Sequence, residues 1–165
     1  MTPALELGDV GQGWCQGRIG NVVVIVYQSA TPDAAVDRSL ERIDRAIAKH
    51  PAGIALLAIF SQNAPAPSSE ARRRISQHLA RSAGKLLIGA TVIEGTNMRA
   101  MATRAATAMM TTILRPPYLH KVLDSAAAAC SFVEPKAVDD ALASMTAGDI
   151  LSGVISLRAA IPSAQ

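Results

Sequence analysis

Residues 22–27, Val-Val-Val-Ile-Val-Tyr, decide the fold. A run of β-branched and aromatic residues predicts a β-strand. Its continuous apolarity, without alternation of polar residues, is typical of a strand that is buried on both faces of a sheet. Gly20-Asn21 before the run and the residues from Ser29 to Pro32 after it mark its ends. The stretch therefore indicates a sheet that is covered by helices.

Segments on either side of this strand extend the pattern. The 4–19 region carries four glycines and predicts one or two short strands, joined by glycine turns, that pair with the 22–28 strand. Apolar runs at 54–61 and 86–93 predict two further long strands, and 120–123 predicts a short one. Helices are expected to start at Thr31-Pro32-Asp33, with Thr31 as the cap, at Ser68-Ser69-Glu70 and at Gly95-Thr96-Asn97.

Alternation of strands and helices predicts an α/β fold with a mainly parallel or mixed sheet of four to five strands and flanking helices. Glu134-Pro135 is the one candidate boundary. We expect an α/β domain over residues 1–134 and a C-terminal helical appendage over 135–165, with helical patterns at 137–146 and 149–159.

Composition narrows the class of protein. Half of the 165 residues are hydrophobic and 18% are charged, which is typical of one globular domain. A net charge of +3 with only 3% aromatic residues disfavours nucleic acid as a partner. Cys15 and Cys130 form no Cys-x-x-Cys pair, so we expect reduced thiols in a cytoplasmic protein. No secretory signal and no membrane span are expected.

Catalytic and metal-binding patterns are weak. The glycines near residues 11–20 precede a strand and do not join a strand to a helix, so they predict turns and not a dinucleotide loop. There is no Gly-x-Ser-x-Gly elbow. His50, His78 and His120 are scattered, without partners at metal-ligand spacing. The sequence predicts no catalytic residue, no metal and no cofactor.

The junctions between strands and helices are the more informative places. Ligands of open α/β sheets gather outside the carboxyl ends of the strands, where helix N-termini present free N–H groups. Hydroxyl and amide side chains at these junctions make a tentative ligand- or phosphate-binding set: Ser61, Ser68, Ser69, Thr96 and Asn97. Ordinary helix capping is the alternative role for the same residues.

Two helices carry candidate contact surfaces. Spacings of four, three and four place Arg74, His78, Arg81 and Lys85 on one flank of the second helix. This basic flank predicts contact with an acidic partner, and a solvated face is the alternative. The third helix carries Met98, Met101, Met109 and Met110 among small apolar residues. It is expected either to pack in the core or to form a homodimer contact.

The order of these segments resembles the STAS-like domains, the family of anti-sigma-factor antagonists and their relatives, including a branch comparable to CRAL-TRIO folds. The resemblance covers roughly residues 15–134 and ends with the 120–129 segment, His-Lys-Val-Leu-Asp-Ser-Ala-Ala-Ala-Ala. The antagonist subgroup carries an Asp-Ser-Ser/Thr-Gly phosphorylation motif after a strand. Here 60–69 has neither the Asp nor the Gly, so the resemblance implies the fold and leaves phosphorylation of Ser68 or Ser69 open.

Three functions follow from these observations. The first is a non-catalytic regulatory or signalling module that acts through protein–protein interaction, with a homodimer as one form. The second is a binding module for a small apolar or anionic ligand at the rim formed by strand ends and helix N-termini. The third, which the sequence favours least, is an enzyme that uses hydroxyls such as those of Ser61, Ser68 and Ser69.

Overall fold

A computed structural model describes residues 3–114 and 116–162, and it describes no side chain between residues 110 and 115. The strands and helices follow one another as β1 (Leu5–Gly11), β2 (Trp14–Ile19), β3 (Val22–Tyr27), α1 (Asp33–Lys49), β4 (Ile54–Phe60), α2 (Ser69–Arg81), β5 (Leu86–Ile93), α3 (Met98–Leu114), β6 (Leu119–Leu123), α4 (Ala126–Val133) and α5 (Ala147–Ala159). Short 3₁₀ turns occupy Ala83–Lys85 and Glu134–Lys136.

The six strands form one mixed sheet in the order β1-β2-β3-β4-β5-β6. The first three are antiparallel, and β3 to β6 are parallel. The α/β class with a mixed sheet and flanking helices is confirmed, while the sheet has six strands where the sequence predicts four to five. The glycine-rich 4–19 region, where one or two strands are predicted, supplies two of the six, β1 and β2.

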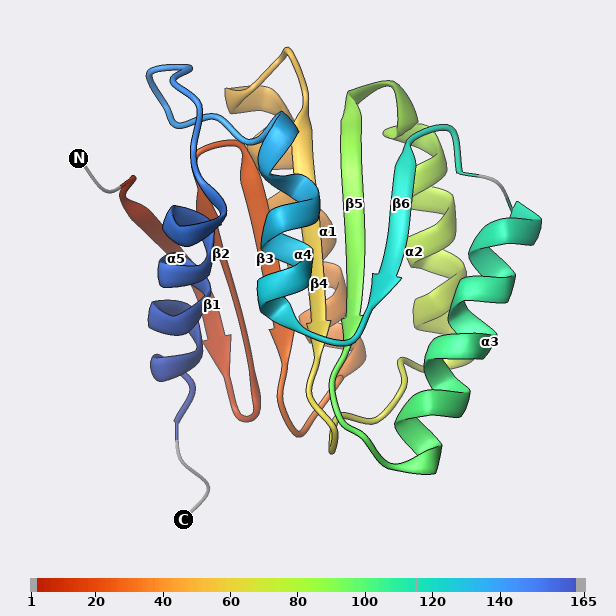
Figure 1. The fold of residues 1–165 in the computed structure, drawn as a ribbon. Helices are drawn as coiled ribbons and strands as arrows, with labels where there is room; N and C mark the ends of the chain where they lie inside the picture. Colours follow the sequence, from red (N-terminus) through yellow and green to blue (C-terminus); the bar gives the residue numbers. More distant parts are fainter. Residues whose placement is uncertain (1–2, 115, 163–165) are drawn as a thin grey trace.

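The side chains of alternate residues in the central strands point into two apolar cores, one on each face of the sheet. Val22, Val24 and Val26 point into the core that α4 and α5 cover, whereas Val23 and Ile25 point into the core beneath α1 and α2. Figure 1 shows α1 and α2 on one face of the sheet, α4 and α5 on the other, and α3 beside the edge strand β6. Because both faces of β3 are buried, its residues are apolar without alternation, as the sequence predicts.

The predicted C-terminal appendage packs onto the sheet. Ile150, Val154 and Leu157 of α5 are buried in the same core as α4. The helical pattern expected at 137–146 is wrong, because this segment forms a turn closed by a bridge between Val138 and Ser144. The Asp139 carboxylate accepts hydrogen bonds from the backbone N–H groups of Ala141 and Ala143, which gives the chain a local alternative to a helix.

A cluster of charged side chains holds this turn against the edge of the sheet that β1 and β2 form. The buried Arg18 guanidinium donates to Asp140 at 2.6 Å, to Glu6 at 2.6 Å and to Nε2 of His50 at 2.8 Å. Burial, followed by the nearby charge of Arg18, lowers the pKa of His50. Lys49 adds a contact to Asp140 at 2.9 Å. The cluster therefore joins β1, β2 and α1 to the 137–146 turn.

The start of α1 differs in detail from the sequence prediction. Pro32 occupies the N-cap position, and no side chain caps the helix. The Thr31 hydroxyl donates instead to the carbonyl oxygen of Pro65, at 2.7 Å, in the loop that precedes α2. The prediction that Thr31 caps α1 is therefore wrong, since its hydroxyl makes a tertiary hydrogen bond.

Among the described residues, the structure contains no helix with the length and hydrophobicity of a membrane span.

Candidate functional site: a cationic cavity beneath helices α2 and α3

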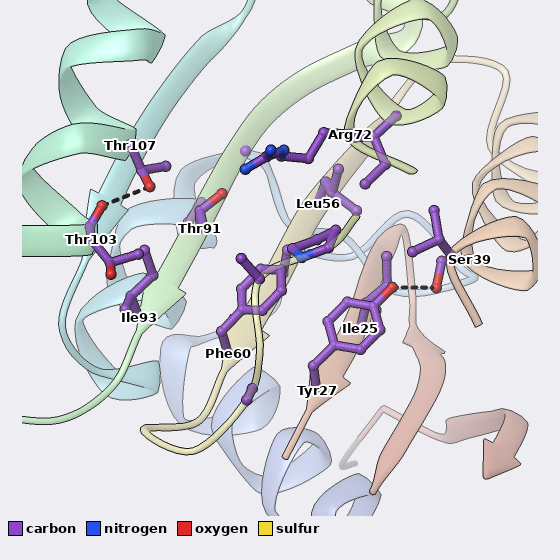
Figure 2. A pocket seen from close by; sticks show the side chains of 18 of the residues that line it. Ile25, Tyr27, Ser39, Leu56, Phe60, Arg72, Thr91, Ile93, Thr103 and Thr107 are labelled. Carbon is purple, nitrogen blue, oxygen red and sulfur yellow. Dashed lines mark hydrogen bonds between the residues drawn. The ribbon is translucent and has the colours of Figure 1, made fainter. Parts of the chain in front are cut away.

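A cavity of about 1040 Å³ lies between the sheet and helices α1, α2 and α3. Its floor is the sheet face that carries Ile25, Tyr27, Leu56, Phe60 and Ile93, and Figure 2 shows these side chains around the open space. Small-molecule pockets usually have volumes of roughly 300–1,000 Å³. The cavity, at about 1040 Å³, therefore lies at the upper end of this range.

Short side chains on the overlying helices explain why this space is not filled. Ala102 and Ala106 are among the residues of α3 that line the cavity, and an alanine side chain ends at Cβ. Ala100 is the one buried residue among the described side chains of α3, and Ala71 is the one buried residue of α2. Neither helix therefore packs closely on β4 and β5, unlike α1, which buries Val36 and Ile43.

Two exposed arginines of the cavity lining have no ion-pair partner among the described residues. Arg72 of α2 and Arg99 of α3 both line it, and within residues 3–114 and 116–162 neither guanidinium has an acidic partner. By contrast, Arg73 is paired with Glu70 at 2.7 Å, and the lining residue Glu94 is paired with Arg158 at 2.6 Å. Figure 2 shows the Arg72 side chain extending from α2 toward the threonines of β5 and α3. A largely apolar cavity with two guanidinium groups that lack acidic partners in the described part of the chain favours an amphipathic anion.

Polar groups also line the wall formed by β5 and β6. The hydroxyl of Thr91 lies 3.1 Å from Nε2 of His120, and Tyr118 lies beside this pair. A Cβ atom on Gly89 would lie 3.0 Å from the Tyr118 ring and 3.1 Å from the His120 ring, so glycine at this position lets both rings lie over β5. Burial lowers the pKa of His120 and raises the pKa of Tyr118, which favours the neutral form of each.

The predicted ligand-binding set divides between the cavity and helix caps. Ser61 and Ser69 line the cavity. The Ser68 hydroxyl instead accepts from the backbone N–H of Ala71 at 3.0 Å and donates to Asp33 at 2.9 Å, so it caps α2. The Asn97 side chain likewise accepts from the N–H of Ala100, at 2.8 Å, at the start of α3. Thr96 is exposed and lies outside the cavity lining.

The predicted basic flank of α2 lies largely against neighbouring parts of the chain. Nε of Arg74 lies 3.0 Å from Asp37 of α1, and Nε2 of His78 lies 2.9 Å from Asp44 of the same helix. Lys85 donates to the carbonyl oxygen of Pro51 at 2.7 Å, while Arg81 is exposed. Contact of this flank with another protein stays a prediction.

Sequence analysis did not single out Arg72, Arg99 or Thr91. A signal for Arg72 exists, because Ile75 and Leu79 follow it three and seven residues later and place it on the inner face of α2. Thr91 alternates with Gly89 and Ile93 in β5 and so occupies an inward position with a polar side chain. A charged or polar residue at a position where the pattern predicts a core residue, such as Arg72 or Thr91, is therefore the sequence signal that indicates this site.

Neither a search for metal ligands nor comparison with known proteins indicates what this site binds. In the part of the chain that the structure describes, no group of three or more His, Cys, Asp and Glu residues is placed to hold a metal ion. Comparison with protein-family models, with curated proteins and with solved structures finds no match for this chain. The resemblance to STAS-like domains stays a prediction from the sequence.

Proposed function

We propose that the protein binds a small amphipathic molecule, with an apolar body and one anionic group, in the cavity beneath α2 and α3. The observation that carries this proposal is the combination of an apolar volume of about 1040 Å³ with two guanidinium groups, Arg72 and Arg99, that lack acidic partners among the described residues. Burying the apolar body of a ligand there would stabilise the complex by about 25 cal/mol per Å² of apolar surface removed from water.

Charge at the lining supports an anionic ligand over a neutral one. Arginine binds carboxylates and phosphates with paired, charge-assisted hydrogen bonds. The guanidinium groups would offer such donors beside the apolar side chains of the sheet, such as Leu56, Phe60 and Ile93. A ligand without an anionic group would form no charge-assisted hydrogen bonds with these guanidinium groups, so its affinity would depend on apolar contacts alone.

Calorimetric titration with palmitate, below its micelle concentration, tests the proposal. The Arg72→Gln/Arg99→Gln variant should bind palmitate at least tenfold more weakly than the native protein, because it loses charge-assisted hydrogen bonds. Arg38→Gln/Arg81→Gln is the matched control, since it removes two exposed arginines that lie outside the cavity lining. Absence of palmitate binding by the native protein, or equal loss in both variants, would reject the proposal.

A regulatory contact with another protein through the outer face of α3 is the second candidate function. The observation in its favour is that Met98 is 87% exposed, Met101 57% and Met109 65%. Methionine surfaces adapt readily to partners. The simplest form is a homodimer, which sedimentation velocity at increasing concentration would detect. The Met98→Glu/Met101→Glu variant should abolish such a dimer, whereas Ile155→Glu on α5, at a residue that is 61% exposed, should not. A monomer at every concentration contradicts the homodimer.

A further inference from the structure

Protonation of His120 is constrained by the surroundings of its ring. Nε2 lies 3.1 Å from the hydroxyl oxygen of Thr91, while Nδ1 is buried and has no hydrogen-bond partner among the residues that the structure describes. A neutral imidazole carries its proton on one nitrogen only, and the other nitrogen is an acceptor. Burial lowers the pKa of His120 and so favours this neutral form.

An unpaired buried N–H is rarer in proteins than an unpaired buried acceptor. Nδ1 is therefore the better position for the lone pair, and Nε2 is the better position for the proton. In that tautomer, Nε2–H donates to the oxygen of Thr91. The Thr91 hydroxyl then keeps its own proton free to donate to a group in the cavity, which Thr91 lines.

Thr91 and Arg72 present their donors to the same part of the cavity. Figure 2 shows the Thr91 hydroxyl on β5 and the Arg72 side chain from α2 pointing toward the space between α2 and α3. A hydroxyl donor beside a guanidinium group suits an anionic oxygen. The opposite end of the cavity, against α1, has a different character, because Val36, Leu40 and Ile43 line it.

The polar side chains near α1, those of Tyr27 and Ser39, already have hydrogen-bond partners within the protein. The Ser39 hydroxyl donates to the carbonyl oxygen of Ala35 at 2.9 Å, and the Tyr27 hydroxyl lies 3.3 Å from Ser39. The residues that α1 contributes to the lining, Val36, Ser39, Leu40 and Ile43, carry no charge. A second anionic group on a ligand would be buried there without a partner, which is costly.

We infer that the ligand is a single-headed monoanion whose anionic group binds between α2 and α3, where Arg72 and Thr91 both donate to it. This inference rests on the proposed function, and it adds the orientation of the ligand and the role of Thr91. His120 is the positioning residue, since it acts on the ligand only through the hydroxyl of Thr91. The chemical class is a long-chain carboxylate or an acidic molecule of similar shape, with no second charge at its apolar end.

Three ligands of equal chain length test the inference by displacement of a dansyl-labelled fatty acid. Palmitate should bind the native protein at least tenfold more tightly than hexadecanedioate or cetyl alcohol. The Thr91→Val variant should lose roughly tenfold or more in palmitate affinity, because a hydrogen bond to a charged group is lost, and Thr91→Ser should retain it. Long-range ¹H–¹⁵N NMR should place the His120 proton on Nε2.

The outcomes separate the two proposals. Equal binding of palmitate and the diacid, full affinity of Thr91→Val, or a proton on Nδ1 of His120 would overturn this inference while the arginine-dependent binding of palmitate stands. No displacement by palmitate from the native protein would overturn the proposed function itself.

Discussion

The guanidinium group of Arg18 on β2 lies 2.6 Å from the carboxylate of Asp140, a residue 122 positions further along the chain. Arg18 is buried, with 4% of its side chain exposed, whereas 53% of the Asp140 side chain is exposed. The pair joins the antiparallel edge of the sheet to the turn that leads into α5. It therefore helps to hold the C-terminal part of the chain on the face opposite the cavity.

Replacing Asp140 by Asn should lower the free energy of unfolding by about 1–3 kcal/mol, because Arg18 loses a charge-assisted partner in a buried position. Glu41→Gln is a matched control, since Glu41 makes exposed ion pairs with Arg38 and Arg45 and such pairs contribute about 0–1 kcal/mol. Urea denaturation of both variants measures the difference. Equal effects of the two substitutions would show that Asp140 contributes no more than a surface pair.

Stability should fall as the pH decreases through the pKa of the unfolded histidines, near 6.5. Burial lowers the pKa values of His50 and His120 in the folded state, so the unfolded chain binds protons first and is favoured at acidic pH. The full contribution of these groups is present above pH 6.5 and decreases below it. Thermal unfolding between about pH 8 and pH 5 measures this effect, and an unchanged midpoint across that range would contradict it.

A second loss of stability is expected at lower pH. The hydrogen bonds of Glu6 and Asp140 with Arg18 lower the pKa values of both carboxyl groups below 4.5 and 3.8, respectively. Their contribution is present above these values and disappears as the pH falls further and protonates the folded state. Unfolding of Asp140→Asn should therefore depend less steeply on pH in this range than unfolding of the native protein.

Filling the cavity should remove ligand binding without unfolding the protein. Ala58 lines the cavity and lies between Ile25 and Thr91 in the sheet register. Ala58→Phe should reduce palmitate affinity at least tenfold, because the ring occupies the space that the ligand needs. Ala80→Phe places the same ring on the exposed side of α2 and should leave binding unchanged. Full palmitate affinity of Ala58→Phe would place the ligand elsewhere.

Gly20 should tolerate no larger residue. Its φ angle of 55° lies in the left-handed region, and a Cβ atom there would collide with the carbonyl oxygen of Val138. Gly20→Ala should lower the free energy of unfolding by at least about 1 kcal/mol. Gly84→Ala is the control, since a Cβ at Gly84 meets nothing within 4 Å. A native-like midpoint for Gly20→Ala in chemical denaturation would contradict this account of the β2–β3 turn.

The layered sheet was predictable because its signals are local. The 22–27 and 54–60 runs are continuously apolar, and the 86–93 run is apolar except at Gly89 and Thr91. Each run is followed by a helix start that the chain marks with Ser, Asn or Pro. The error at 137–146 has a local cause as well. Asp139 accepts two backbone hydrogen bonds, and Leu142 adopts a φ angle of 64°, so the segment turns in spite of its helical spacing.

The cavity was not predictable from periodicity. Ala71, Ile75 and Leu79 form the same inner stripe whether α2 packs tightly on the sheet or stands above an open space. The separation of helix and sheet depends on side chains from several elements, such as the alanines of α3 and Gly89 of β5. For the same reason, the spacing that places Arg72 on the inner face of α2 does not show that a cavity lies there or that Arg74 pairs with Asp37 of α1.

Methyl NMR of the protein titrated with palmitate tests the central claim most directly. The two faces of the sheet carry separate sets of methyl groups, with Ile25, Leu56 and Ile93 lining the cavity and Ile150 and Leu157 in the opposite core. We predict that palmitate shifts the signals of the first set and gives intermolecular NOEs to them, while the second set is unchanged. Shifts confined to the core around α5, or no shifts at all, would contradict the assignment of the cavity as a ligand site.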